Sequence, residues 1–408
     1  MNYIAVMGHG VVGSGVVEVF EKNAAGIEQK CGGPIEIRYI LDIRKFPECS
    51  YADKFTRNFK DILNDPEISV VAEVIGGISP AYEYVKALLE SGKSVVSSNK
   101  ELIAQKGAVL LQIARENNVN LFFEASVGGG IPIIRPLHQC LSANEITEIA
   151  GILNGTTNFI LTKMINQSMS FDDALSLAQS LGYAERDPSA DVDGHDACRK
   201  ICILASLVFG KHIYPQFVHT EGIRDITLAD VEYIKEYGGV IKLIAKAKNI
   251  GGRIEMAVTP AVVSCQSQLS GIDDVYNGIL VRGNATGDVV FYGKGAGKLP
   301  TASAVAADII NAVTSGGTCK SLMWTDDNTN PVADFATNSS AFYLRLSGDI
   351  NSIENLFSDA KLIKLDNKSA DEIAVITKIM SESEMENLIK KCRNNKITLI
   401  NMIRVSDC

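Results

Sequence analysis

The chain has 408 residues, which is enough for two or three domains and for a full hydrophobic core without disulfides or a structural metal. Lys and Arg number 39 against 48 Asp and Glu, and a net charge of −9 without a basic cluster argues against a nucleic-acid partner. Nine scattered cysteines without zinc-ligand spacing fit a reducing compartment, and no apolar run reaches the ~18 residues of a membrane span. We therefore expect a soluble, cytoplasmic, multidomain protein with no membrane partner.

The first 130 residues alternate short apolar strands with helical patterns. The expected strands span residues 3–7, 35–41, 70–75, 94–97 and 121–123, and the clearest helices span residues 81–91 and 101–117. Strands rich in Val and Ile that alternate with helices of this length predict βαβ units. Residues 1–130 are therefore predicted to form an α/β domain around a doubly wound parallel sheet.

Two further regions follow. Residues 131–320 mix strand patterns (145–153, 253–263) with helical ones (159–166, 171–181, 197–209) and predict an α+β domain. Within it, the Gly-rich stretch 283–300 leads into a helix at 301–313, and the chain then becomes polar and loop-like from 318 to 338. Residues 339–408 predict a small unit with strands at 342–346, 362–365, 372–377 and 397–405 and helices at 353–357 and 385–392. That βαββαβ order is the ferredoxin-like pattern.

A glycine-rich turn directly follows the first expected strand and opens a helix. Its sequence, GHGVVG, matches the GxGxxG pattern of Rossmann-type NAD(P) domains. In that pattern Gly8 allows the tight turn, Gly10 lets the backbone approach a pyrophosphate, and Gly13 lets the helix pack on the strand. The N–H groups at the helix start, at Val11 and Val12, would face the phosphates. The alternative is a tight βα turn without a ligand.

The residues that would read the cofactor's ribose are ambiguous. Asp42 ends the second expected strand, where an acid binds a ribose 2′-OH and favours NAD. Arg44 and Lys45 follow, and either could instead pair with the 2′-phosphate of NADP. All three could also be solvated loop charges. The sequence leaves NAD against NADP open, and we expect both cofactors to be used.

The densest polar segment, residues 182–200, holds five carboxylates and then two cations at the start of an apolar helix. If Asp196 lies in that helix, Lys200 follows one turn later on the same face, and Asp191 precedes both. Carboxylates suit a substrate's ammonium group, and a lysine among them can give or take a hydroxyl proton during hydride transfer. The alternative is an acidic loop that caps a helix, with Asp196 and Lys200 as an i,i+4 salt bridge.

A second lysine, Lys100, follows the fourth expected strand at the carboxyl edge of the predicted sheet, where ligands bind in doubly wound folds. Its alternative is an exposed residue in the first turn of a helix. The five histidines show no pairing with a Ser or Cys nucleophile, and GxSxG is absent, which argues against an acyl-transfer hydrolase.

At this point the chain resembles homoserine dehydrogenases over essentially its whole length. The motifs that carry the resemblance are GHGVVG, EVIGG (73–77), NKE (99–101), EASVGGGIPII (124–134), GILNGTTNFIL (151–161), LGYAERDPSADVDGHDACRKICIL (181–204) and YGKGAGKLPTASAV (292–305). The resemblance implies reversible, NAD(P)-dependent interconversion of L-homoserine and L-aspartate 4-semialdehyde, on the route to threonine and methionine. It also implies that residues 339–408 are an ACT-like regulatory domain, whose amino-acid binding and threonine inhibition the sequence leaves open.

The resemblance also implies roles for single residues. Lys200 matches the catalytic lysine, and Lys100 matches a second active-site lysine near the nicotinamide. The substrate-binding positions it implies are Gly182, Glu185, Asp191 and Asp196. The cofactor-binding positions are Gly8, Gly10, Val11, Val12, Gly13, Asp42, Arg44, Lys100 and Gly297. A monovalent cation such as sodium would be held mainly by backbone carbonyls of Glu124, Val127, Gly129 and Ile131.

The resemblance further implies a homodimer or homotetramer formed through the middle region, and residues 151–153 are a candidate for a sheet shared between subunits. Two other functions compete with the dehydrogenase. One is another NAD(P)-dependent reductase of a small amino-acid aldehyde or 2-oxo acid. The other is a catalytically silent sensor with an ACT-type module, against which the presence of both Lys100 and Lys200 argues.

Overall fold

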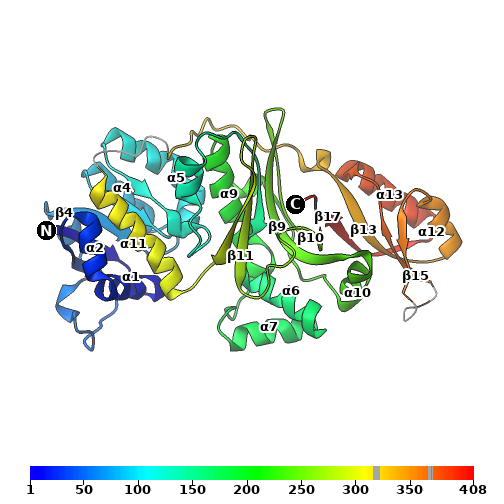
Figure 1. Ribbon diagram of the computed structural model, residues 1–408, viewed down its shortest axis with the longest axis horizontal. Helices are drawn as coiled ribbons and strands as arrows, with labels where there is room; N and C mark the ends of the chain where they lie inside the picture. The colour runs from blue at the N-terminus through cyan, green and yellow to red at the C-terminus, as the bar shows by residue number, and fades with distance from the viewer. Residues whose placement is uncertain (316–321, 366–368, 370) are drawn as a thin grey trace. The chain divides into compact units, whose positions relative to one another are not determined.

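Figure 1 shows the computed structural model of the chain. The structure describes residues 1–315, 322–365, 369 and 371–408. The chain divides into two compact units. Unit 1 comprises Met1–Glu145, Cys202–Pro215 and Gly293–Asn330, and unit 2 comprises Ile146–Ile201, Gln216–Tyr292 and Pro331–Cys408. The domain boundaries expected from the sequence at residues 130, 320 and 339 stay a prediction. Among the helices that the structure describes, none has the length and apolar composition needed to cross a membrane.

Unit 1 is built on a six-stranded parallel sheet in the order β3-β2-β1-β4-β5-β6. Its strands are β1 (Asn2–Met7), β2 (Ile35–Leu41), β3 (Phe55–Thr56), β4 (Ile68–Glu73), β5 (Ser94–Ser97) and β6 (Leu121–Phe122). The predicted doubly wound α/β sheet is therefore confirmed. Because the strand order reverses between β1 and β4, the carboxyl ends of these two strands form the switch point where such sheets bind ligands.

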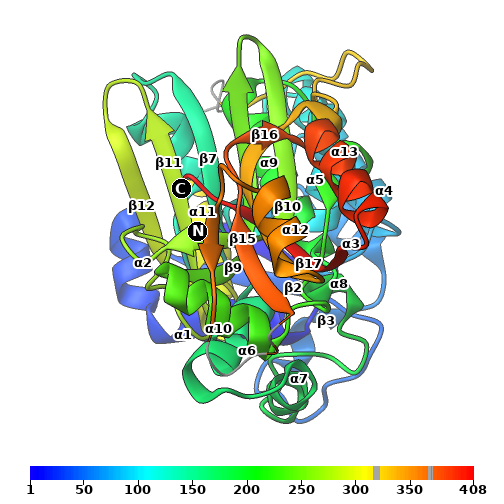
Figure 2. The same cartoon turned by 90° about the vertical axis from the view of Figure 1, so that its right-hand side faces the viewer.

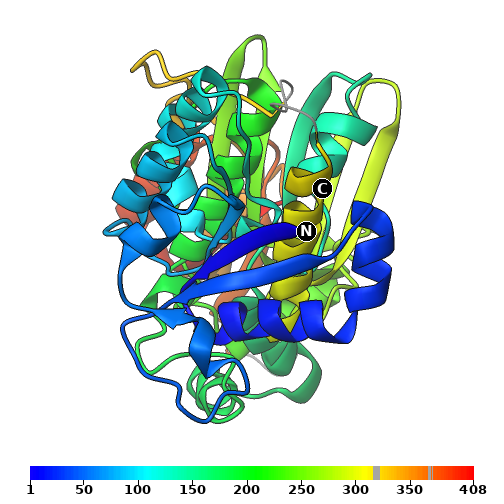
Figure 3. The ribbon, with the colours of Figure 1, turned by 90° about the vertical axis from the view of Figure 1, so that its left-hand side faces the viewer.

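Helices cover the sheet of unit 1. They are α1 (Val11–Lys22), α2 (Ala24–Cys31), α3 (Phe59–Leu63), α4 (Ala81–Glu90), α5 (Lys100–Glu116) and α11 (Lys298–Thr314). In Figure 3 the yellow helix α11 lies beside the blue helix α1, and a Cβ added at Gly15 would come within 2.8 Å of the Lys298 carbonyl oxygen. Glycine at position 15 thus permits the close approach of the two helices.

Unit 2 contains the larger sheet, with eleven strands. Its main path runs β12-β11-β7-β9-β10-β17-β13-β15-β14. The strands of its first half are β7 (Ile146–Ile152), β9 (Gly239–Ile250), β10 (Arg253–Ser264), β11 (Tyr276–Gly283) and β12 (Gly287–Lys294), with β8 (His219–Thr220) paired to β10. The helices are α6 (Gly155–Gln167), α7 (Phe171–Ser180), α8 (Ser189–Val192), α9 (His195–Phe209, of which residues 195–201 belong to this unit) and α10 (Leu228–Tyr237).

The sequence analysis predicted β7, β10, α6, α7 and α9 but assigned no element to residues 228–250 or 276–283. It also described 283–300 only as Gly-rich, whereas the structure places strand β12 there. Most side chains of β12 are partly or fully exposed, so the strand lacks the buried-exposed alternation that marks a half-buried strand. In β9, which is mostly buried, three lysines at positions 242, 246 and 248 interrupt the apolar run.

The C-terminal part of unit 2 has the predicted βαββαβ order. Its elements are β13 (Ser339–Ser347), α12 (Ile350–Leu356), β14 (Lys361–Ile363), β15 (Glu372–Ile376), a short additional β16 (Met380–Ser381), α13 (Glu382–Asn394) and β17 (Thr398–Val405). The strand β17 also pairs in parallel with β10, so this part continues the large sheet, as Figure 2 shows. Its identity as an ACT-like regulatory domain stays a prediction.

The strand β7 lies inside the large sheet. Its two edges are hydrogen-bonded to β11 and to β9 within the same chain. Gly151 is paired on both edges, and Ile152 is paired to Gly278 of β11. A sheet shared between subunits could continue through an outer strand, so the shared sheet expected around residues 151–153 stays a prediction.

Candidate functional site

The glycine-rich turn at the end of β1 has the geometry that a phosphate needs. Gly8 has a φ of +101°, and a Cβ added there would lie 2.9 Å from the Val74 carbonyl oxygen. A Cβ at Gly13 would lie 1.9 Å from the Gly8 carbonyl oxygen, whereas the space beside Gly10 is open. Gly10 is also the N-cap of α1 and makes no side-chain cap hydrogen bond, so the backbone N–H groups at the helix start, at Val11 and Val12, suit an anion.

Asp42 and Arg44 form a tight pair beside this turn. The carboxylate of Asp42 accepts hydrogen bonds from the backbone N–H of His9 (2.8 Å) and from the Arg44 backbone N–H and guanidinium (2.9–3.0 Å). The Arg44 hydrogen bonds hold the pKa of the Asp42 carboxyl far below its usual range. Arg44 also donates to the carbonyl oxygen of His9 at 2.9 Å. The pair therefore fixes Asp42 as an anion and holds Arg44 against the backbone of the glycine-rich turn.

A cavity of about 470 Å³ opens next to this pair. Its charged lining residues are Asp42, Arg44, Lys45 and Arg57. Three cations and one carboxylate leave a net positive lining, and the ring of Phe46 contributes an apolar wall. Arg57 was not among the residues predicted from the sequence, because it lies 15 positions beyond Asp42 on the other side of an irregular loop.

Lys100 lies where the sequence predicted it, at the carboxyl edge of the parallel sheet. It is the first residue of α5, and the preceding Asn99 caps the helix by accepting the backbone N–H of Leu102 at 3.1 Å. The neighbouring strand β4 ends in Glu73, a fully buried carboxylate that the sequence analysis missed as a site residue. Its only sequence signal was its place in the EVIGG motif.

In unit 2, three of the predicted substrate and catalytic residues form one cluster, in which Lys200 and Asp196 are buried and Asp191 is partly buried. The Nζ of Lys200 donates to Asp196 at 2.6 Å and to the carbonyl oxygen of Leu153 at 2.8 Å. The side-chain amide of Asn154 donates to Asp191 at 2.7 Å and to Asp196 at 2.9 Å. Lys200 and Asp196 are only 9% and 5% exposed, so these charges depend on one another for compensation.

Asn154 holds this cluster together, and the sequence analysis did not single it out. It is the N-cap of α6, and its side-chain oxygen accepts the backbone N–H of Thr157 at 2.8 Å. With its oxygen engaged there, its amide nitrogen is free to point at the two carboxylates. An Asn between a strand and a helix in GILNGTTN was a capping signal that could have identified it.

The i,i+4 salt bridge that served as the alternative interpretation of Asp196 and Lys200 is present. It does not exclude the catalytic interpretation, because Asp191 and Asn154 join the same cluster. Gly182 and Glu185, in contrast, lie in an exposed turn after α7, where Gly182 has a φ of +75°. Within the described part of the chain, no contact joins the Glu185 carboxylate to the cluster.

Glu124, predicted to help hold a cation, uses its side chain elsewhere. Its carboxylate accepts the backbone N–H groups of Ile133, Ile134 and Arg135 at 2.6, 2.7 and 2.8 Å. Its own N–H donates to the buried Asp308, which also pairs with Arg135 at 2.7 Å. Burial, reinforced by the nearby Glu124, raises the pKa of Asp308 to about 7. The carboxylate of Glu124 therefore organises the loop rather than facing an ion.

The cation site expected from the sequence concerns mainly the backbone carbonyls of this loop, and it stays a prediction. The carbonyl oxygens of Val127, Gly129 and Ile131 accept no hydrogen bond from the described residues. Gly129 has a φ of +54°, and a Cβ there would lie 2.5 Å from the carbonyl oxygen of Gly295. Gly297 follows as the N-cap of α11, the helix that packs on α1. Carbonyl oxygens without donors are suitable ligands for a hard monovalent cation.

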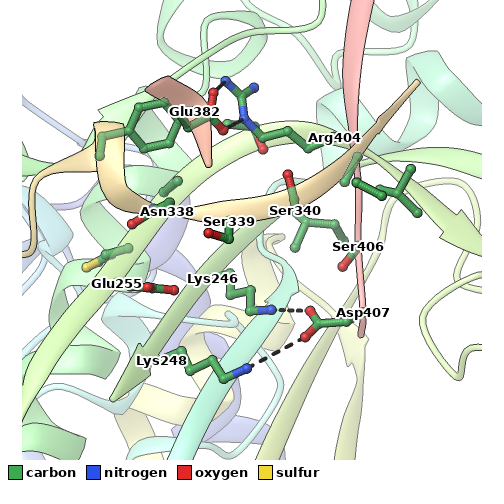
Figure 4. Close-up of a pocket in the computed structure, with 18 of the residues that line it drawn as sticks. Lys246, Lys248, Glu255, Asn338, Ser339, Ser340, Glu382, Arg404, Ser406 and Asp407 are labelled. Carbon is green, nitrogen blue, oxygen red and sulfur yellow. Dashed lines mark hydrogen bonds and ion pairs between the residues drawn. The ribbon is translucent and has the colours of Figure 1, made fainter. Parts of the chain in front are cut away.

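A further cavity of about 280 Å³ lies in unit 2, where β9 and β10 meet β13 and β17 (Figure 4). Lys246 and Lys248 both point toward Asp407, while Arg404 holds Glu382. None of the site residues predicted from the sequence is among those that line this cavity.

Comparison with known proteins places both the N-terminal and the middle part of the chain in one family. Residues 8–124 match the family model "Homoserine dehydrogenase, NAD binding domain", and residues 132–310 match the model "Homoserine dehydrogenase". The homoserine dehydrogenase of Bacillus subtilis is 35% identical over 412 residues, covering 97% of this chain and 95% of the relative. That of Synechocystis is 42% identical over 320 residues, covering 76% and 73%.

Solved structures agree with the sequence relatives. A homoserine dehydrogenase from Thiobacillus denitrificans matches with a TM-score of 0.89 and 33% identity, over 99% of this chain and 98% of that one. A hyperthermophilic archaeal homoserine dehydrogenase, solved in complex with NADPH, matches with a TM-score of 0.65 and 29% identity, over 76% and 97%. The chain therefore belongs to the homoserine dehydrogenase family of NAD(P)-dependent oxidoreductases.

Proposed function

We propose that the chain interconverts L-homoserine and L-aspartate 4-semialdehyde, with Lys200 as the residue that moves the hydroxyl proton. The observation that carries this assignment is the buried cluster in which Lys200, Asp196, Asp191 and Asn154 are hydrogen-bonded to one another. An NAD(P) cofactor would supply the hydride acceptor for the alcohol carbon. Oxidation of homoserine then yields the aldehyde, the reduced cofactor and one proton.

The chain's own residues would transfer the hydroxyl proton and bind the substrate. The Leu153 carbonyl and Asp196 hold the Nζ of Lys200 in place. Its neutral amine would receive the hydroxyl proton during oxidation, and the ammonium form would return that proton during reduction. Asp191 and Asp196 provide negative charge for the substrate's ammonium group, and Glu185 adds a further carboxylate from an exposed turn. Lys100 sits at the sheet edge as the second active-site lysine.

An assay with the purified chain tests this assignment. We expect homoserine-dependent reduction of NADP or NAD, followed by the absorbance of the reduced cofactor, and the reverse reaction with L-aspartate 4-semialdehyde. A substrate analogue that lacks the ammonium group should turn over poorly, because it loses the attraction between that positive charge and the carboxylates of the cluster. Faster turnover of a 2-oxo acid would instead favour a different reductase of the same architecture.

We infer that the chain uses both cofactors and favours NADP. The support is the cavity beside Asp42, whose lining combines one carboxylate with Arg44, Lys45 and Arg57. Two net positive charges attract a 2′-phosphate, which Arg side chains bind through paired hydrogen bonds. Asp42, already saturated by four hydrogen bonds, keeps less capacity to accept a 2′-OH than an unpaired acid would.

Two substitutions should move this preference in opposite directions. Asp42→Ala removes the negative charge and should raise the ratio of kcat/KM for NADP over NAD, and Arg44→Ala should lower it. Each shift should be at least about threefold, or ~0.65 kcal/mol. The control is Lys60→Ala, which removes an exposed cation of the same unit outside the cavity. This explanation of cofactor choice is wrong if the ratio of kcat/KM for NADP over NAD is unchanged in both test variants, or if it changes equally in the control.

The loop of residues 124–131 is proposed to hold a sodium ion through the carbonyls of Val127, Gly129 and Ile131. A higher melting temperature in sodium chloride than in choline chloride would support the ion site.

The chain is further proposed to act in the cytoplasm as a homodimer or homotetramer. A monomeric mass in light scattering at micromolar concentration would argue against the oligomer.

A further inference from the structure

Glu73 is a fully buried carboxylate at the carboxyl end of β4 for which the reaction described above has no use. Its Oε1 accepts the backbone N–H groups of Ile75 at 2.9 Å and Gly76 at 3.4 Å. Its Oε2 accepts the hydroxyl of Ser97 at 2.6 Å, and the amide of Asn99 lies 3.5 Å from Oε1. Two loops at the edge of the sheet therefore converge on this one side chain.

The hydrogen bonds around Glu73 favour the ionised carboxylate. Three of its four contacts come from N–H groups, which can only donate, at Ile75, Gly76 and Asn99. The fourth is the hydroxyl of Ser97, which donates to Oε2 at 2.6 Å while its oxygen accepts the backbone N–H of Asn99 at 3.0 Å. Burial raises the pKa of Glu73, and these donors oppose that rise. An ionised carboxylate accounts for the geometry.

Glu73 also occupies the switch point of the parallel sheet. In register it lies between Met7, which leads into the glycine-rich turn, and Ser97, which leads toward Lys100. Dinucleotides bind across this point in doubly wound sheets. The cavity that suits the adenosine half lies at the end of β2, beside Asp42. The nicotinamide half would therefore extend in the opposite direction, over the ends of β4 and β5.

We propose that the ionised carboxylate of Glu73 makes this site discriminate between the two redox forms of the cofactor. The oxidised nicotinamide ring carries a positive charge that the reduced ring lacks. A fixed negative charge inside the protein, where screening is weak, stabilises the oxidised form selectively. The inference rests on the cofactor site proposed above, and it assigns Glu73 an electrostatic role in addition to holding two loops together.

Binding measurements on two variants separate charge from shape. Glu73→Gln keeps the size of the side chain and removes its charge, whereas Glu73→Asp keeps the charge and shortens the side chain. By calorimetric titration, Glu73→Gln should raise the Kd for NADP⁺ about tenfold and change the Kd for NADPH less than about twofold. In Glu73→Asp the ratio of the two Kd values should stay within about twofold of the wild-type ratio, even if both values change.

The control variant is Ser97→Ala, which removes one hydrogen-bond donor and leaves the carboxylate in place. It should change both Kd values in parallel. The proposal is overturned if Glu73→Gln weakens both redox forms equally, since Glu73 would then only position the loops. It is also overturned if Glu73→Asp, which keeps the charge, changes the ratio of the Kd values for NADP⁺ and NADPH as much as is expected for Glu73→Gln. The Glu73→Asp variant still tests the proposal if Glu73→Gln does not fold. A wild-type chain that binds neither form would instead refute the proposed cofactor site.

Discussion

Replacing Lys200 with alanine is expected to lower kcat by about 10²–10⁴-fold and to leave the affinity for NADP nearly unchanged. Lys200 is the ammonium group of the buried cluster, and its Nζ is held at 2.6 Å from Asp196 and 2.8 Å from the Leu153 carbonyl. The variant loses the group that moves the hydroxyl proton. Steady-state kinetics with homoserine, together with calorimetric titration of NADP, measures both effects.

The same substitution should also destabilise the protein, because it leaves Asp196 buried without its cation. Breaking a buried ion pair costs about 3–5 kcal/mol, so the folded state of the variant must be verified by its melting curve. Lys163→Ala is the matched control: Lys163 lies in the same unit and pairs with Asp274 at 3.0 Å, outside the cluster. If the Lys200→Ala variant kept more than half of the wild-type activity, Lys200 would not be the residue that transfers the hydroxyl proton.

Asp196→Asn is expected to raise the KM for homoserine by at least about tenfold and to lower kcat as well, while the KM for the cofactor changes by less than about twofold. Two effects combine. The substitution removes a charge proposed to attract the substrate's ammonium group, and it replaces the charged acceptor that holds Lys200 with a neutral amide. Loss of a hydrogen bond to a charged group is worth about 1.5–3 kcal/mol, which corresponds to this range.

Substitutions at two other carboxylates separate the effect on substrate binding from the effect on Lys200. Glu185→Gln should raise the KM for homoserine without a comparable loss of kcat, because no described contact links Glu185 to Lys200. Asp193→Asn is the control, since Asp193 lies in the same turn as Asp191 but pairs with Arg224 at 2.5 Å. If Asp196→Asn changed the KM values for homoserine and cofactor equally, Asp196 would not be a substrate-binding residue.

The sequence by itself determined the parts of this protein that depend on local order. The alternation of Val-rich strands with helices predicted the parallel sheet, and GHGVVG predicted the phosphate-binding turn at its first strand. Glycine is required at Gly13 by the nearby carbonyl oxygen of Gly8, and at Gly8 by its own positive φ; both are local features that a short motif records. The four-residue spacing of Asp196 and Lys200 likewise predicted their contact, because a helix brings such residues together.

The tertiary structure alone decided which distant residues meet. Asn154 contacts Asp196 across 42 positions, because the start of α6 lies beside the start of α9. Glu73 contacts Ser97 across 24 positions, because β4 and β5 end at the same edge of the sheet. Asp42 could have faced the ribose or Arg44, and the backbone of His9, 33 positions away, completes its hydrogen bonds. Periodicity describes one element at a time, whereas these hydrogen bonds depend on how separate elements pack. Only the folded chain therefore shows which carboxylates are paired and which remain open to a ligand.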